Sequence, residues 1–130
     1  MKSTKPKVVY IAHPISGAVK KNIKLVIEIC RLYLTFEIIP LAPYLASLQY
    51  LNNKSSKDLA IGMGINKLYF QKRFVHELWL FGDRISKGME QEIEWAFEYN
   101  IPVIAKTLKT RKALKQFIDK KRPKNSKKKI

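Results

Sequence analysis

Cysteine, histidine and long apolar runs are scarce in this 130-residue chain. The single cysteine, Cys30, excludes an internal disulfide framework and a zinc site built from cysteines. The two histidines, His13 and His76, have no carboxylate or thiol at metal-ligand spacing, so we expect no bound metal. No apolar run approaches the roughly 18 residues that a membrane span requires. The apolar run after the basic N-terminus is too short for the core of a signal peptide, which predicts a cytoplasmic protein.

The composition is that of one folded domain with a basic end. Hydrophobic residues make up 46% of the chain and charged residues 28%, which excludes wholesale disorder. The net charge of +16 is uneven, since residues 106–130 carry 12 Lys and Arg against one acid, Asp119. We therefore expect a domain over residues 1–120 and a disordered basic tail over residues 121–130. Such a tail either keeps the chain in solution or makes weak, nonspecific contact with nucleic-acid phosphates.

Strand and helix patterns alternate along the domain. Short β-branched and aromatic runs predict strands, and apolar residues at helical spacing between them predict helices. The alternation indicates an α/β fold: a three-layer, doubly wound sheet of about four parallel strands, flavodoxin-like or Rossmann-like. The expected strands cover residues 7–12, 36–40, 76–82 and 101–105, and the expected helices cover residues 17–34, 56–73, 87–99 and 108–120.

Ligands of such sheets bind beyond the carboxyl ends of the strands. This rule selects residues 13–17, 40–44 and 82–92 as the places where a site is expected. A dinucleotide fingerprint is excluded, because Gly62 and Gly64 fall inside a helical pattern and Lys67 stands where a third glycine belongs. There is no phosphate-binding loop of the Gly-x-x-x-x-Gly-Lys type either.

Two serine-glycine segments begin helices at this edge. Ser16-Gly17 and Ser86-Lys87-Gly88 place free backbone N–H groups and a helix dipole where an anion would be favoured. The alternative is ordinary helix capping, which serine favours whatever the function. His13, at the carboxyl end of the first strand, is a candidate to face a ligand.

An acidic cluster beginning at the third strand is the most informative feature. Glu90 and Glu92 flank the apolar stripe of the helix that begins near Lys87, on opposite sides, and periodicity does not choose between them. We expect the carboxylate to stay ionised near the helix N-terminus. Asp83 lies on the same edge. A carboxylate beside a second one suits attack on an electrophilic sugar carbon.

Residues 10–17 read YIAHPISG and residues 77–96 read ELWLFGDRISKGMEQEIEWA. These two segments resemble the nucleoside 2-deoxyribosyltransferase-like family, in its small members. The second segment is similar to the family's Ser-x-Gly-x-x-x-Glu spacing, with an alanine four residues later. Residues 58–64, DLAIGMG, look like the family's middle helix. The positions that match the second motif are Ser86, Gly88, Glu92 and Ala96, which favours Glu92 over Glu90.

The resemblance implies cleavage or transfer at the N-glycosidic bond of a 2′-deoxyribonucleoside or its 5′-monophosphate. Glu92 would be the nucleophile, oriented by Tyr10, and Asp83 would hold a sugar hydroxyl. The resemblance implies no cofactor. It does imply that the protein forms a homo-oligomer. The first alternative is a non-catalytic module that senses or sequesters a nucleotide. The second, less favoured alternative is a protein that binds nucleic acid through the basic tail. The residues expected to bind substrate are His13, Ser16, Gly17, Asp58, Ser86 and Gly88.

Overall fold

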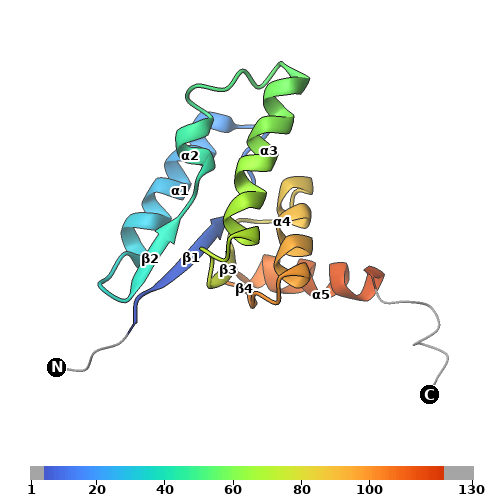
Figure 1. Ribbon diagram of the computed structural model, residues 1–130. Helices are drawn as coiled ribbons and strands as arrows, with labels where there is room; N and C mark the ends of the chain where they lie inside the picture. The colour runs from blue at the N-terminus through green and yellow to red at the C-terminus, as the bar shows by residue number, and fades with distance from the viewer. Residues whose placement is uncertain (1–4, 122–130) are drawn as a thin grey trace.

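The structure, a computed structural model, describes residues 5–121. Figure 1 shows a parallel sheet whose strands alternate with helices, as the sequence predicts. The three-layer α/β fold is therefore confirmed. The elements are β1 (Lys7–Ala12), α1 (Val19–Tyr33), β2 (Ile38–Leu41), α2 (Tyr44–Ser47), α3 (Ser56–Gln71), β3 (Glu77–Leu80), α4 (Lys87–Glu98), β4 (Val103–Ala105) and α5 (Leu108–Lys121).

The four strands are all parallel and lie in the order β2-β1-β3-β4. The chain leaves β1 toward β2 on one side and reaches β3 on the other, so the winding reverses between β1 and β3. Open α/β sheets bind their ligands at such a reversal, beyond the carboxyl ends of the strands. The loops that follow β1 and β3 meet at this point.

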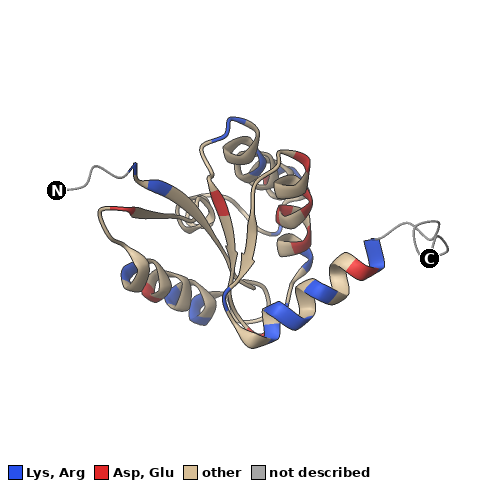
Figure 2. Cartoon of the chain, turned by 90° about the horizontal axis from the view of Figure 1, so that it is seen from below, with Lys and Arg blue, Asp and Glu red and all other residues tan. Residues whose placement is uncertain are grey.

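Helices cover both faces of the sheet. On one face, Tyr33 of α1 packs edge-on against Trp79 of β3, with ring centroids 5.2 Å apart. On the opposite face, Phe70 of α3 packs between Tyr10 of β1 and Trp95 of α4, at 4.9 and 5.7 Å. Figure 2 shows Lys and Arg along α1 and α5 and a concentration of Asp and Glu on α4, so the two helical layers differ in charge.

The core forms around the central strand. Residues 9–12 of β1 have no exposed surface, as expected for a strand covered on both faces. The sequence places the end of the second strand at Pro40, but β2 continues through Pro40 to Leu41. That prediction is wrong because β2 is an edge strand, where a proline removes no ladder hydrogen bond on its outer side.

The helix boundaries follow local signals closely. Ser55 caps α3, since its Oγ accepts a 3.2 Å hydrogen bond from the backbone N–H of Asp58. Asn100, the residue after the C-cap of α4, adopts the left-handed conformation at φ 57°. Ser16-Gly17 was expected to open α1, but the N-cap is Ala18. Gly17 takes a φ of +95°, which keeps the chain out of the helix at that point.

The last helix extends one residue past the predicted domain boundary. Lys121, assigned by sequence to the tail, is the final residue of α5, and its Nζ lies 2.8 Å from Glu94 Oε2 of α4. The rest of the expected basic tail, residues 122–130, lies outside the described residues, as do residues 1–4. Within residues 5–121, no helix has the length and apolar character needed to cross a bilayer.

Candidate active site

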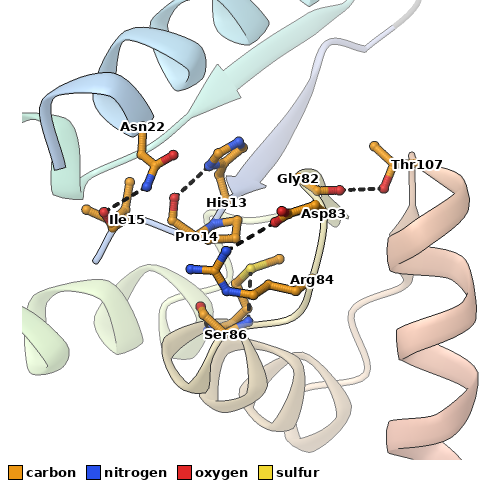
Figure 3. Close-up of polar contacts among 10 residues, drawn as sticks. His13, Pro14, Ile15, Asn22, Gly82, Asp83, Arg84, Ser86 and Thr107 are labelled. Atoms are coloured by element: carbon orange, nitrogen blue, oxygen red, sulfur yellow. Dashed lines mark hydrogen bonds and ion pairs between the residues drawn. The ribbon is translucent and has the colours of Figure 1, made fainter. Parts of the chain in front are cut away.

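Two loops meet at the carboxyl edge of the sheet, and Gly82 allows their approach. Gly82 follows β3 with a φ of +96°, and a Cβ there would lie 2.6 Å from Cδ of Pro14 in the loop after β1. The Gly82 carbonyl also accepts a 2.8 Å hydrogen bond from Oγ1 of Thr107, just before α5 (Figure 3). No other residue fits this position, because a side chain would collide with the Pro14 ring.

His13 lies at the contact between these loops. Its Nδ1 is 2.7 Å from the carbonyl oxygen of Pro14 (Figure 3). A carbonyl only accepts, so Nδ1 carries the proton and Nε2 is the ring nitrogen left for a ligand. His76, in contrast, is structural: its Nδ1 accepts a 2.8 Å hydrogen bond from the backbone N–H of Val8.

A cavity of about 550 Å³ opens at this edge, between the loops after β1 and β3 and the helices α2, α3 and α4. This volume is in the range of small-molecule sites. The structure brings six of the sequence-predicted site residues together in its lining: His13, Ser16, Asp58, Ser86, Gly88 and Glu92.

Glu92 is a buried acid in the wall of this cavity. Only 8% of its surface is exposed, and its Oε2 accepts a 2.6 Å hydrogen bond from the hydroxyl of Tyr10. Burial raises the pKa of Glu92 to about 8, and the hydrogen bond from Tyr10 opposes that rise. The expectation of an ionised carboxylate is therefore wrong for Glu92 at neutral pH. It lies in the second turn of α4, where desolvation outweighs the helix dipole.

Tyr10 of β1 contacts Glu92 but does not itself line the cavity. Its ring is fully buried against Phe70 and lies 6.2 Å from the ring of Tyr44. Burial raises the pKa of both tyrosines, with a further contribution from Glu92, so they remain neutral hydrogen-bond donors. The hydroxyl of Tyr44 donates to the carbonyl of Ile11 at the end of β1, which holds α2 beside the cavity.

Ser16 and Ser86, the two serines at the rim of the cavity, have different roles. Ser86 is the N-cap of α4, because its Oγ accepts a 3.3 Å hydrogen bond from the N–H of Met89. Ser16 caps no helix and lines the cavity from the loop after β1. Arg84 and Lys87 also line the cavity and bring two cations to its rim, of which Arg84 is paired with Asp83.

Asp58 lines the cavity with a carboxylate that already has a partner. Its Oδ2 accepts a 2.7 Å hydrogen bond from the backbone N–H of Asn52. This hydrogen bond joins the loop before α3 to the first turn of that helix. The carboxylate of Asp58 therefore stabilises the loop in addition to lining the cavity.

Asp83 and Gly17 lie apart from Glu92. Both line a neighbouring cavity of about 470 Å³ on the α1 side of the loops and are missing from the lining of the first. Asp83 is exposed and its Oδ1 lies 3.1 Å from Nη1 of Arg84 (Figure 3). The structure thus does not bring Asp83 to the carboxylate it was expected to accompany.

Sequence reasoning did not single out Asn66, Arg84 or Lys87, which all line the cavity. Arg84 and Lys87 sit within the matched motif, so their position was a usable signal. Asn66 lies four residues after Gly62 and four before Phe70, on one face of α3. A polar residue at this spacing from Phe70 was the sequence signal that could have indicated Asn66 as a site residue. Among residues 5–121, no three His, Cys, Asp or Glu side chains gather as a metal site would require.

The fold and site define a Rossmann-like α/β protein with a ligand cavity at the carboxyl edge of its sheet. The chain belongs to the family described as a domain of unknown function (DUF7768), which matches residues 7–106. The match runs from β1 to the end of β4 and so includes both loops of the site. No curated protein and no solved structure matches the chain.

Proposed function

We propose that this protein cleaves or transfers at the N-glycosidic bond of a 2′-deoxyribonucleoside or its 5′-monophosphate, with Glu92 as nucleophile. The observation that carries the proposal is the buried Glu92 carboxyl in the cavity wall, held by Tyr10 at 2.6 Å. A carboxyl group buried and held in this way, with its pKa displaced, is typical of a catalytic position. Glu92 also lies in the motif that resembles the deoxyribosyltransferase-like family, and the proposed reaction is taken from that resemblance.

The ionised form of Glu92 attacks C1′ of the sugar. Tyr10 donates to Oε2, so Oε1 forms the new bond to C1′. The C1′–N bond breaks, its electron pair leaves with the base nitrogen, and that nitrogen takes a proton from a water molecule, which leaves hydroxide to the solvent. The product is a deoxyribosyl ester of Glu92. Water then releases the free sugar, or a second base takes the sugar and restores the carboxylate.

The rim of the cavity suits a 5′-phosphate. Arg84 and Lys87 supply positive charge, and the backbone at Ser86 and Gly88 begins α4, where the dipole favours an anion. His13 offers Nε2, and Ser16 a hydroxyl, from the opposite loop. No cofactor enters this chemistry.

Three further parts of the proposal concern the setting of the protein. The half-exposed Leu59 and Met63, at the mouth of the cavity, support a homo-oligomer in which a second copy covers this wall. Weak, nonspecific contact with nucleic acid is proposed through the basic tail, residues 121–130, and the basic side chains of α5 support it. The proposed location is the cytoplasm, where Cys30 stays a free thiol.

The deciding experiment is chromatographic detection of free base after incubation with each of the four 2′-deoxynucleosides and their 5′-monophosphates. Released base supports the enzyme, and added acceptor base distinguishes transfer from hydrolysis. Binding without release under every condition would overturn the proposal in favour of a nucleotide-sensing or sequestering module.

A further inference from the structure

A second cavity, of about 470 Å³, lies on the α1 side of the loops and takes no part in the reaction proposed at Glu92. Three residues line both this cavity and the cavity of Glu92: His13, Ser16 and Arg84. These shared residues come from the loops after β1 and β3, so the two cavities adjoin where the winding of the sheet reverses. A ligand bound beside Glu92 can therefore extend across these loops into the second cavity.

Hydrogen bonds hold both walls of the second cavity in place. Nδ2 of Asn22 in α1 donates a 2.9 Å hydrogen bond to the carbonyl of Ile15, which fixes the loop after β1 against that helix (Figure 3). The loop after β3 is held in turn by the 2.8 Å hydrogen bond from Thr107 to the carbonyl of Gly82. Because these loops are already positioned, a ligand does not have to order them on binding.

The charge of the second cavity comes from Lys21. Arg84 also lines this cavity, but its charge is balanced by Asp83, another lining residue, whose Oδ1 lies 3.1 Å from Arg84 Nη1. Lys21 forms no ion pair within residues 5–121, so it leaves the cavity with one uncompensated positive charge. In addition, no side chain caps α1 and its first turn holds no acid, so its backbone N–H groups add donors. The second cavity therefore suits an anion.

The distance along α4 indicates which part of a nucleotide reaches Lys21. Gly88 and Glu92 are four residues apart, which is about 6 Å along a helix axis. A sugar whose C1′ meets Glu92 thus has its 5′-phosphate at the start of α4, as proposed above. A further phosphate would lie beyond it, at the border that Arg84 and His13 form with the second cavity. Lys21 lines only the second cavity, so a monophosphate does not reach it.

We infer that the preferred ligand is a 2′-deoxynucleoside 5′-diphosphate, whose second phosphate binds in the second cavity to Lys21. The inference rests on the proposed function and adds to it the substrate class and a specificity-determining residue outside the cavity of Glu92. The ammonium group of Lys21 donates to the phosphate oxygens, and hydrogen bonds between two charged groups are stronger than neutral ones. A monophosphate leaves Lys21 in water and gains nothing from it.

The test compares the 5′-monophosphate and the 5′-diphosphate of each of the four 2′-deoxynucleosides by calorimetric binding to the full chain. EDTA is present, so that no divalent cation screens the phosphates. For each base that binds, wild type should bind the diphosphate about tenfold more tightly than the monophosphate. Lys21→Gln should bring this ratio close to one and leave the affinity for the monophosphate unchanged. Lys20→Gln is the matched control, because Lys20 is an exposed neighbour on α1 that does not line the cavity, and it should keep the ratio.

The outcomes separate this inference from the proposed function. Equal affinity for diphosphate and monophosphate in wild type would overturn the inference. A ratio that survives Lys21→Gln, or one that Lys20→Gln lowers equally, would also overturn it. The proposed function then still stands, because release of free base from the monophosphates tests it separately. No binding of any nucleotide would overturn both. Lys21→Glu gives a second check, since repulsion of the second phosphate should make this variant prefer the monophosphate, and a retained preference for the diphosphate refutes the inference.

Discussion

The hydroxyl of Tyr10 donates a 2.6 Å hydrogen bond to Oε2 of Glu92, joining the central strand to α4 across 82 positions of sequence. Both groups are buried, so this bond is formed in a medium where an unpaired carboxyl would be costly. The tyrosine orients the acid and opposes part of the rise in its pKa that burial causes.

Replacing Glu92 tests the nucleophile. Glu92→Gln keeps the size and the partner of Tyr10 but removes the charge that attacks C1′, so base release should fall to background while nucleotide binding remains. Glu90→Gln, on the other flank of the same helix, is the matched control and should retain most activity. Loss of activity in Glu90→Gln with activity kept in Glu92→Gln would mean that the motif is misaligned by two residues.

The pH dependence of base release follows from the raised pKa of Glu92. With a pKa of about 8, about a tenth of the protein carries the carboxylate at pH 7. The rate at low substrate concentration should rise about tenfold per pH unit below 8 and level off above it. In Tyr10→Phe the stabilising hydrogen bond is gone, so the midpoint should move to higher pH. A flat profile between pH 6 and 9 would contradict the role of ionised Glu92.

The same pKa predicts how stability changes with pH. The folded-state pKa of Glu92, about 8, exceeds its ordinary value of 4.5. Between these values the native state holds one more proton than the unfolded state, so this group lowers the free energy of unfolding as pH rises. Glu92→Gln has no titrating group at this position, so it does not undergo this decrease in the free energy of unfolding. Its melting temperature should exceed that of wild type by on the order of 5 °C or more at pH 9, with little difference at pH 4. Thermal denaturation followed by circular dichroism at both pH values measures this, and a destabilised variant at pH 9 would disprove it.

A phosphate at the rim predicts a preference among ligands. Deoxynucleoside monophosphates should raise the melting temperature more than the matching nucleosides do, because Arg84, Lys87 and the start of α4 add contacts for the anion. The double variant Arg84→Gln, Lys87→Gln should lose this difference and keep the response to nucleosides. Equal stabilisation by both ligands in wild type would leave Ser86 as a helix cap alone.

Truncation tests the expected tail. A chain ending at Lys121 keeps the 2.8 Å ion pair between Lys121 and Glu94, and we expect its melting temperature to stay within about 2 °C of the full chain. Its affinity for a random DNA duplex should fall and become less sensitive to salt, since phosphate contacts are lost. A drop of many degrees would show that residues 122–130 pack on the domain.

Local patterns in the sequence determined the elements of this fold. Alternating β-branched runs and helical stripes predicted about four parallel strands with helices between them, and the structure has four. These features depend on backbone preferences and on residues a few positions apart, which are visible in a single sequence. The same patterns identified the edge of the sheet where the cavity lies.

Only the tertiary structure decided the chemistry at that edge. Glu90 and Glu92 both flank the apolar stripe of α4, but only Glu92 meets Tyr10 and becomes buried, which raises its pKa to about 8. Asp83, close to Glu92 in sequence, turns to the other cavity, and Asn66, far from it in sequence, joins the same one. Burial, and with it protonation, depends on which elements pack together, and no pattern within one helix carries that information.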